Sequence, residues 1–332
     1  MLLLLSLWGT ILQGYMYLFR ESYVNELLIS FLPYAIGINF LLILFSCYKI
    51  IYNYKKKNIF LTIIWLIIGI AWISYNRNYI NEYTHTYTNI FTQASNKVTS
   101  SSEWLSFLYA NIYYKNKDFS GLFSTIENYQ PDIILLVEYA KIHDETLTPL
   151  LKQKYPYVSR YVWGKWYDGD VIYSKYPLEK IKHTVYPWSF SHVSIQHNNK
   201  NIDFALIHTS APVSQYFFTM RSEQLSDLSN LMTEYYNTKK DQNIILLGDF
   251  NLTPRSHYYK SFDTSMKSLW LSNITTDIVN TQYDNKLLPY TRCHEQATYL
   301  CSHIDHLRSN TSMKLQKINI PWSDHYGFIG KI

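Results

Sequence analysis

The chain has 332 residues, more than one average domain, and 17% of them are charged. Its formal net charge is +5, but residues 1–84 hold six Lys and Arg against three Asp and Glu, which leaves 24 against 22 for the rest. Non-specific nucleic-acid binders usually present a strongly basic face. The near-neutral charge of residues 85–332 therefore argues against a protein that binds nucleic acid through a strongly basic surface. A local basic patch is still compatible with the sequence.

Three apolar stretches with almost no charge fill the first quarter of the chain, at residues 2–19, 27–51 and 59–75. Each approaches the roughly 17–25 residues that cross a bilayer, and none has the polar face of a globular core helix. We therefore expect a membrane region of about three helices within residues 1–84. A cleaved signal peptide is the alternative for the first stretch, which contains Gln13 and Gly14, although no basic residue precedes it.

Basic residues predict the orientation of this region. Lys49 and the lysines at 55–57 lie in or beside the second connection, whereas Arg20 in the first is balanced by Glu21 and Glu26. Because basic loops favour the cytoplasm, the chain should leave the third span on the extracytoplasmic side. We expect a multi-pass protein of the cell (inner) membrane with a periplasmic or other extracytoplasmic domain. Residues 85–102, rich in Asn, Tyr, Thr and Ser, indicate a stalk or linker.

Alternating strand and helix patterns fill residues 103–332. Apolar runs typical of strands occur at residues 105–113, 133–138, 171–173, 202–208, 244–247 and around 299–307, and helical patterns occur at 119–128 and 221–236. In the second helical pattern Leu225, Leu228 and Met232 recur at helical spacing, which predicts core packing. This alternation predicts an α/β fold.

Polar residues suited to phosphoryl chemistry end or follow these runs: Asn111, Glu138, His208, Asp249 with Asn251, Asp305, and Asp324 with His325. Asp249 and Asn251 are two residues apart, so on an extended chain they point to the same side. A carboxylate and an amide side by side position a water and hold a phosphate oxygen. Each residue alone would pass for an ordinary turn or surface residue, but solvated turns have no reason to produce this ordered set. The set predicts a divalent-metal phosphoesterase site.

In this order the motifs resemble those of the endonuclease/exonuclease/phosphatase superfamily, over roughly residues 103–332. The resemblance rests on Ala110-Asn111-Ile112, the PDIILLVE string ending at Glu138, the IHTSAP string around His208, the helix string RSEQLSDL, Gly248-Asp249-Phe250-Asn251, the HIDHL string around Asp305, and Ser323-Asp324-His325. It implies a catalytic domain built as a four-layer sandwich, in which two mixed β-sheets are flanked by helices. The site would lie at one edge.

The resemblance also implies a role for each residue. Glu138 would be the principal metal ligand with Asn111 nearby, and Asp324 would bind a second ion. Asp249 would orient or deprotonate the attacking water, and Asn251 would hold a phosphate oxygen. His325, oriented by Asp305, would bind the phosphate, and His208 would act from the opposite side. The carboxylate that family members place against this last histidine is not located in the sequence. Oxygen ligands without a Cys/His cluster favour Mg²⁺, or Mn²⁺ or Ca²⁺, over zinc.

The leading functional hypothesis is a membrane-anchored, metal-dependent phosphodiester hydrolase, nuclease-like, with nucleic acid as substrate. The alternatives are a phospholipase C-like sphingomyelinase or lipid/inositol phosphatase, which a membrane anchor favours, and a catalytically degenerate binding domain, which the intact acidic and His positions oppose. Besides its substrate, the lipid bilayer is the expected partner of the N-terminal helices. The WGKW segment at 163–166 predicts either a stacking or lipid-contacting loop or buried packing. Cys293 and Cys301 form a disulfide or remain two reduced thiols.

Overall fold

The computed structural model describes residues 22–30, 48, 67, 104–161, 169–182, 190–239, 242–254, 256–268, 272–273, 291–294, 297–311 and 313–332. The chain divides into two compact units, one of residues 1–88 with 255–257 and one of residues 89–254 with 258–332. In the first unit, α2 (Tyr23–Ser30) is the described helix. The described residues include very little of the three expected spans. They do not include the 85–102 linker or the WGKW segment. None of the helices in the described part is long and apolar enough to cross a membrane.

Two six-stranded mixed sheets form the second unit. The first has the order β13-β14-β1-β2-β4-β3 and the second β5-β6-β7-β8-β12-β9. The strands of the first sheet are β1 (Ser106–Asn111), β2 (Ile133–Val137), β3 (Tyr157–Tyr161), β4 (Asp170–Ser174), β13 (Lys314–Asn319) and β14 (Tyr326–Lys331). Those of the second are β5 (Glu179–Lys180), β6 (Phe190–His197), β7 (Lys200–His208), β8 (Asn243–Asp249), β9 (Ser272–Asn273) and β12 (Asp305–Ser309). Two parallel pairs, β1 with β2 and β7 with β8, lie at the centres of the sheets.

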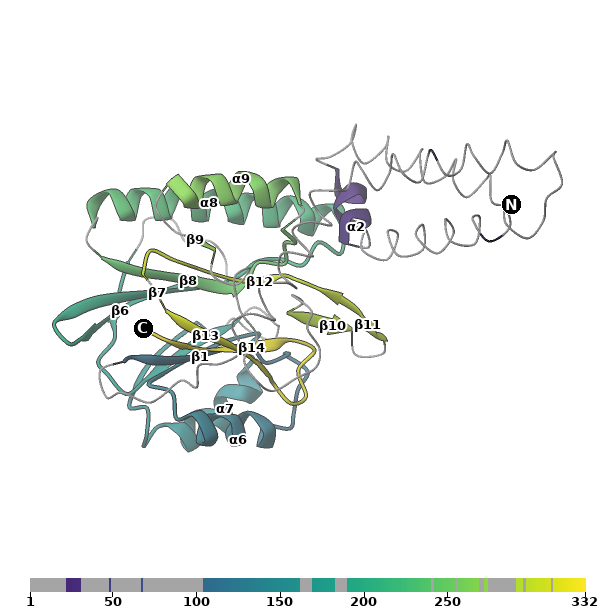
Figure 1. Cartoon of the computed structure of the whole chain (residues 1–332). Coiled ribbons are helices and arrows are strands. Elements are labelled where there is room, and N and C mark those ends of the chain that lie inside the picture. Colours follow the sequence, from purple (N-terminus) through teal and green to yellow (C-terminus); the bar gives the residue numbers. More distant parts are fainter. Residues whose placement is uncertain are drawn as a thin grey trace, which may run out of the picture. The chain divides into compact units, whose positions relative to one another are not determined.

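Helices cover the outer face of each sheet. Figure 1 shows α6 (Ser120–Tyr129) and α7 (Lys141–Leu151) against the first sheet, and α8 (Gln215–Thr238) and α9 (His257–Ser268) against the second. Three clusters of buried apolar residues fill the layers, one under each helix pair and one between the sheets. Along β1, Leu108 faces the helix side and Phe107 the neighbouring sheet, so a strand with two covered faces needs a continuous apolar run. The expected two mixed sheets flanked by helices are confirmed.

Two sequence expectations about elements are corrected. The run around 299–307, expected as one strand, forms β11 (Ala297–Ser302) and β12, because residues 303–304 separate the two. β11 pairs with β10 (Arg292–His294) in a two-stranded sheet of its own, whereas β12 pairs with β8. The helix expected from Arg221 begins at Gln215, since the Ser214 side chain caps it by accepting a hydrogen bond from the Phe217 N–H.

The β10–β11 hairpin contains Cys293 and Cys301. Cys293 is disulfide-bonded, and the register of the hairpin places Cys301 opposite it. Adjacent to Cys293 in β10, Arg292 forms an isolated bridge with His325. The hairpin therefore borders the residues that the sequence predicts as the active site.

Candidate active site

Four of the eight predicted site residues lie at the carboxyl ends of the two central parallel pairs. Asn111 ends β1 and Glu138 follows β2, while His208 ends β7 and is in register with Asp249 at the end of β8. Parallel strands present their carboxyl ends at the same edge of a sheet. We call this common edge of the two sheets the site edge. The antiparallel strand β12 starts there, because Asp305 is in register with Asp249.

Asn111 connects the two sheets at the site edge. Its amide Nδ2 donates to Glu138 Oε1 at 3.0 Å and to Asp249 Oδ2 at 3.1 Å, and its Oδ1 accepts a hydrogen bond from the Tyr113 N–H at 3.0 Å. The second oxygen of Glu138 accepts a hydrogen bond from the Tyr114 N–H at 2.9 Å. The buried amide therefore bridges the two carboxylates and holds them close together.

Asp249 and Asn251 do not sit on an extended chain, contrary to the sequence expectation. Asn251 has φ 45°, and its backbone N–H donates to Asp249 Oδ1 at 2.8 Å, which closes a local turn. The Asn251 Nδ2 donates to the carbonyl oxygen of Thr209 at 2.8 Å, and the buried Arg221 guanidinium donates to the Asn251 carbonyl at 2.7 Å. The two side chains are still neighbours, but a turn and two long-range hydrogen bonds place them rather than strand alternation.

His325 is held in a buried chain of polar groups. Its Nδ1 lies 2.8 Å from Asp305 Oδ2, and the Tyr109 hydroxyl donates to Asp305 Oδ1 at 2.7 Å. On the other side of the ring, Nε2 lies 3.7 Å from Asp249 Oδ2 and 3.8 Å from Asp324 Oδ1. Burial alone would lower the pKa of His325, but the charge and hydrogen bond of Asp305, together with the charges of Asp249 and Asp324, raise it to about 9. The imidazole is therefore a cation at neutral pH.

Asp249 is buried among like and opposite charges. Burial and the negative charge of Asp305 raise its pKa to about 6, while His325 and His208 act in the opposite direction. This pKa leaves Asp249 ionised at neutral pH yet basic enough to accept a proton. A positioned general base works best when its pKa lies close to the working pH.

His208 has looser contacts than His325. Its Nε2 lies 4.0 Å from Glu138 Oε1 and 3.9 Å from Asp249 Oδ2. A further carboxylate, Asp170, lies near this side of the site edge, because β4 pairs with β2 and places Asp170 opposite Val137. Asp170 is fully buried and accepts a hydrogen bond from the Ser191 hydroxyl. Burial raises the pKa of Asp170 to about 7, although Ser191 and Lys180 lower it in part.

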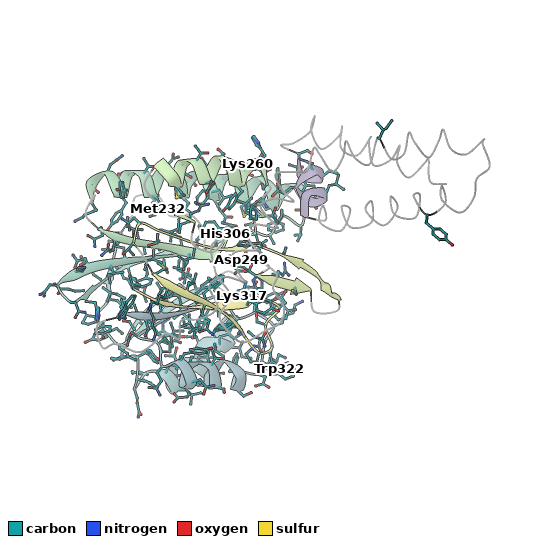
Figure 2. The ribbon with its side chains drawn as sticks, viewed as in Figure 1. Met232, Asp249, Lys260, His306, Lys317 and Trp322 are labelled. Carbon is teal, nitrogen blue, oxygen red and sulfur yellow. The ribbon has the colours of Figure 1, made fainter. Side chains whose placement is uncertain are left out.

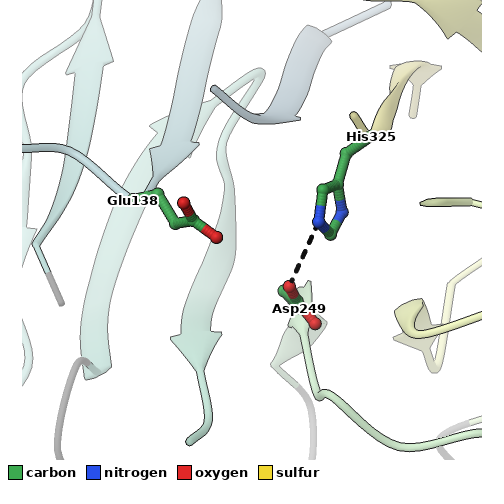
Figure 3. Close-up of side chains that lie close together, drawn as sticks. All are labelled: Glu138, Asp249 and His325. Carbon is green, nitrogen blue, oxygen red and sulfur yellow. Dashed lines mark ion pairs between the residues drawn. The ribbon is translucent and has the colours of Figure 1, made fainter. Parts of the chain in front are cut away.

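Three ligand-type side chains converge on one point (Figure 3). One ligand atom from each of Glu138, Asp249 and His325 lies within 4.8 Å of the others. Carboxylate oxygens are the preferred donors for Mg²⁺, Mn²⁺ and Ca²⁺, and two of these three side chains are carboxylates. The residues present therefore fit a hard divalent cation held by Glu138 and Asp249.

The other two predicted metal ligands, Asn111 and Asp324, have competing contacts. Because Asn111 Oδ1 accepts from Tyr113, its amide nitrogen, which cannot bind a cation, faces the carboxylates. Asp324 Oδ2 forms an ion pair with Arg292 Nε at 2.9 Å. Ligation by Asn111 would require its amide to rotate, whereas Asp324 Oδ1 has no hydrogen-bond partner among the described residues and is available while Oδ2 stays paired. Both roles stay predictions.

All eight predicted residues belong to one network of hydrogen bonds and ion pairs, but sequence reasoning missed several residues that shape it. They are Tyr109 on Asp305, Arg292 on Asp324, Arg221 on Asn251, Ser323, whose hydroxyl donates to the Asn111 carbonyl at 2.7 Å, and Asp170. Ser323 was visible in the closing Ser-Asp-His string. Arg221 opens the RSEQLSDL string, although its contact with Asn251 could not be read from it. Tyr109, Arg292 and Asp170 carry no local signal, because their partners are distant in the sequence.

The comparison with protein families agrees with this geometry. A family model described as Endonuclease/Exonuclease/phosphatase family matches residues 108–325. The chain belongs to this family. Its members are hydrolytic phosphoesterases, so this member of the Endonuclease/Exonuclease/phosphatase family is a hydrolase that acts on ester bonds. No curated protein matches the chain in sequence.

Solved structures resemble this family member at the level of the fold. A beta toxin structure from Staphylococcus aureus is 20% identical with a TM-score of 0.50, and the match covers 68% of this chain and 99% of the toxin. The catalytic domain of human Nocturnin is 17% identical with a TM-score of 0.50, covering 70% and 95%. TDP2 from D. rerio, complexed with a single strand DNA product, is 13% identical with a TM-score of 0.50, covering 69% and 98%.

Proposed function

We propose that this chain is a divalent-metal-dependent phosphodiester hydrolase with nucleic acid as its leading substrate. The observation that carries the proposal is the convergence of Glu138, Asp249 and His325 on one point, with a carboxylate pair facing an imidazolium. Hydrolysis of a phosphodiester needs a positioned water, a base to take its proton, and positive charge at the phosphate oxygens. At the site edge, Asp249 would supply the base, His325 the positive charge, and the carboxylate pair would position the water.

The residues divide this work between them. Asp249 accepts the proton of the attacking water, and its turn with the Asn251 N–H fixes the carboxylate. His325, kept cationic by Asp305, holds a phosphate oxygen and stabilises the charge that develops there. One hydrogen of the Asn251 amide is taken by Thr209, and the other is available to the phosphate.

Glu138, with Asp249, would hold the cation, and Mg²⁺, Mn²⁺ or Ca²⁺ bound there would neutralise charge on the phosphate. His208 approaches from the side of the carboxylate pair opposite Asp305 and can exchange a proton with substrate, because it has no short hydrogen bond to a carboxylate among the described residues. The roles of Asn111 and Asp324 as ligands belong to the same proposal.

Nucleic acid is favoured as substrate by one of the similar structures, since the D. rerio TDP2 of that structure is complexed with a single strand DNA product. Phospholipid or sphingomyelin is the second candidate class, supported by the apolar N-terminal stretches of the sequence. We further propose that these stretches anchor the protein in the cell membrane, with the catalytic unit on the extracytoplasmic side. A reporter active only outside the cytoplasm, fused after Thr84, should be active, while one fused near Tyr54 should not.

The central experiment measures turnover of DNA, RNA, sphingomyelin and a chromogenic phosphodiester by the wild type and by three variants. Asp249→Asn, His325→Ala and Glu138→Gln should each lower kcat by about 10²–10⁴-fold. Excess Mg²⁺ or Mn²⁺ should partly restore Glu138→Gln, whereas Asp249→Asn should not recover, because saturation with metal does not replace the lost proton acceptor. Asp132→Asn is the matched control, since Asp132 precedes β2 at the opposite end of the strand from Glu138. Full activity after chelation of divalent ions would refute the metal requirement.

A further inference from the structure

A strained turn directly precedes the Ser-Asp-His string. The Ser323 N–H donates to the Ile320 carbonyl at 3.1 Å, Pro321 occupies the second position of the turn, and Trp322 the third, with φ 66°. Proline fixes a negative φ, so a positive φ at the next residue makes this a type II turn. Gly or Asn is the usual residue at that position, because a side chain is disfavoured at positive φ. Trp322 therefore occupies a position that a smaller residue would fill at lower cost.

The turn is fixed on both sides. Pro321 packs directly on Gly121 of α6, where an added Cβ would come within 2.3 Å of the proline Cβ. The Ser323 hydroxyl donates to the Asn111 carbonyl at 2.7 Å and accepts from the His325 N–H at 3.0 Å. Trp322 lies between these two anchored residues, and 67% of its surface is exposed. The structure thus presents a large aromatic ring from a rigid turn, and nothing in its burial explains the strain.

Trp322 is close in the chain to His325, the proposed phosphate-binding cation. Three peptide units separate it from His325, so their Cα atoms are at most about 11 Å apart. Figure 2 shows Trp322 at the margin of the catalytic unit and Asp249 in its interior. The loop between β1 and α6 carries the exposed Lys115 and Lys117, and Gly121 in the first turn of α6 packs on Pro321. An exposed aromatic ring and two exposed lysines therefore lie on the two segments that precede His325 and follow Asn111 in the chain.

We propose that Trp322 is a base-stacking residue that binds a nucleobase next to the scissile phosphodiester of single-stranded nucleic acid, an inference that rests on the proposed function. Proteins bind single strands by stacking bases on aromatic side chains while lysines track the backbone phosphates. A ring held rigidly before binding loses little conformational entropy on stacking. The backbone strain at Trp322 would then be the free-energy cost of holding the ring in its binding position before the nucleic acid arrives.

A lipid surface is the competing ligand for an exposed tryptophan, and the observations favour it less. Interfacial binding normally uses a face with several apolar side chains. In this turn, Ile320 is buried and Pro321 is packed on α6, so among residues 320–323 Trp322 alone is an exposed aromatic. A double-stranded nucleic acid offers no free base face to the ring without unstacking.

The test uses the full chain and the substitution Trp322→Asn, which suits a positive φ and removes the ring. We expect the affinity for a fluorescently labelled single-stranded DNA oligonucleotide, measured by anisotropy in the presence of chelator, to fall about 5- to 150-fold. KM for the same oligonucleotide should rise, while kcat/KM for a small chromogenic phosphodiester stays unchanged. The melting temperature should rise by about 2–4 °C, because the strain is relieved. A merely structural tryptophan would give a lower melting temperature.

Trp104→Ala is the matched control. Trp104 is 37% exposed and precedes β1, whose opposite end carries Asn111, so its loss should leave oligonucleotide binding unchanged. Unchanged DNA affinity in Trp322→Asn would overturn the proposal, as would a loss of binding to phosphatidylcholine–sphingomyelin vesicles in place of DNA. Because the binding assay contains chelator, it does not depend on cleavage. If no substrate is hydrolysed but Trp322→Asn still weakens DNA binding, the proposed function fails and the stacking inference stands.

Discussion

Two buried aspartates near the site edge, Asp305 and Asp170, differ in how well they are paired. Both are fully buried. One carboxylate oxygen of Asp305 accepts a hydrogen bond from the Tyr109 hydroxyl, and the other lies 2.8 Å from His325 Nδ1. The Asp305 backbone N–H donates to the Thr291 hydroxyl oxygen. Asp170 receives the Ser191 hydroxyl on one oxygen, and its other oxygen has no hydrogen-bond partner among the described residues.

The two predicted site histidines, His325 and His208, also differ in how closely they are paired with a carboxylate. His325 has a carboxylate oxygen 2.8 Å from Nδ1, whereas the carboxylates nearest to His208 Nε2 among the described residues lie 3.9 and 4.0 Å away. A short charge-assisted hydrogen bond fixes a ring and its charge. The two surroundings support the different roles proposed for the two histidines, a fixed cation for His325 and a proton carrier for His208.

The largest effect should come from removing the fixed cation. We expect His325→Ala to lower kcat by about 10²–10⁴-fold, because it removes the positive charge at the phosphate. His208→Ala should lower kcat less, since water or buffer can exchange a proton in its place. Steady-state kinetics on one phosphodiester compares them, with circular dichroism as the check on folding. Equal losses in the two variants would remove the distinction between the histidines.

The next effect concerns the carboxylate that supports the cation. In the wild type, activity should fall as pH rises through about 9, the pKa at which His325 loses its proton. Asp305→Asn removes the negative charge, so the pKa of His325 should fall and this limb of the pH profile should move to lower pH. A downward shift of one unit lowers kcat/KM about tenfold at pH values well above 9 and about twofold at pH 8. A profile of kcat/KM with an unmoved alkaline limb would contradict this account.

Replacement of Asp170, of which only one carboxylate oxygen is hydrogen-bonded within the described part of the chain, should change the stability of the fold rather than the turnover of substrate. Its folded-state pKa of about 7 exceeds the ordinary value of 3.8, so the folded protein prefers the protonated form. This contribution is fully present below pH 3.8 and is lost as pH rises through about 7. Asp170→Asn should therefore raise the free energy of unfolding at pH 8 by on the order of 2–4 kcal/mol relative to the wild type, and much less at pH 4.

Asp132 provides a control, because the pKa of its carboxyl is shifted in the direction opposite to that of Asp170. Burial raises the pKa of this carboxyl, but Ser106 and Lys175 outweigh burial and lower it. Asp132→Asn should therefore reduce stability at pH 8. Urea unfolding of both variants at pH 4 and pH 8 makes the comparison. An Asp170→Asn variant whose stability shows the same pH dependence as the wild type would contradict the assignment.

The smallest effect should come from the hydroxyl that fixes Asp305. Tyr109→Phe removes a hydrogen bond to a charged group and should destabilise the fold by about 1.5–3 kcal/mol. It should also lower kcat modestly, because Asp305 can then rotate away from His325. Tyr155→Phe is the matched control, since its buried hydroxyl donates to the Pro131 carbonyl at 2.8 Å, away from the site edge. Equal kinetic effects of the two changes would show that Tyr109 acts through packing alone.

The sequence by itself determined the fold class and grouped the residues that the structure brings together at the site edge. The apolar runs that precede Asn111, Glu138, His208 and Asp249 are local patterns in the sequence. A strand that is buried on both faces is apolar along its length, whichever strand it pairs with. The order of the motifs was sufficient to group them, because parallel strands bring their carboxyl ends to one edge. The membrane segments, the linker and the domain bounds stay predictions, since they lie largely outside the described residues.

Only the tertiary structure decided how the grouped residues are oriented and charged. The left-handed backbone at Asn251, the rotation of the Asn111 amide and the pairing of Asp324 with Arg292 depend on contacts between residues far apart in the sequence. The pKa values of Asp249 and His325 depend on burial and on charges brought from other strands. Long-range electrostatics and burial have no periodicity along the chain, so no local pattern records them.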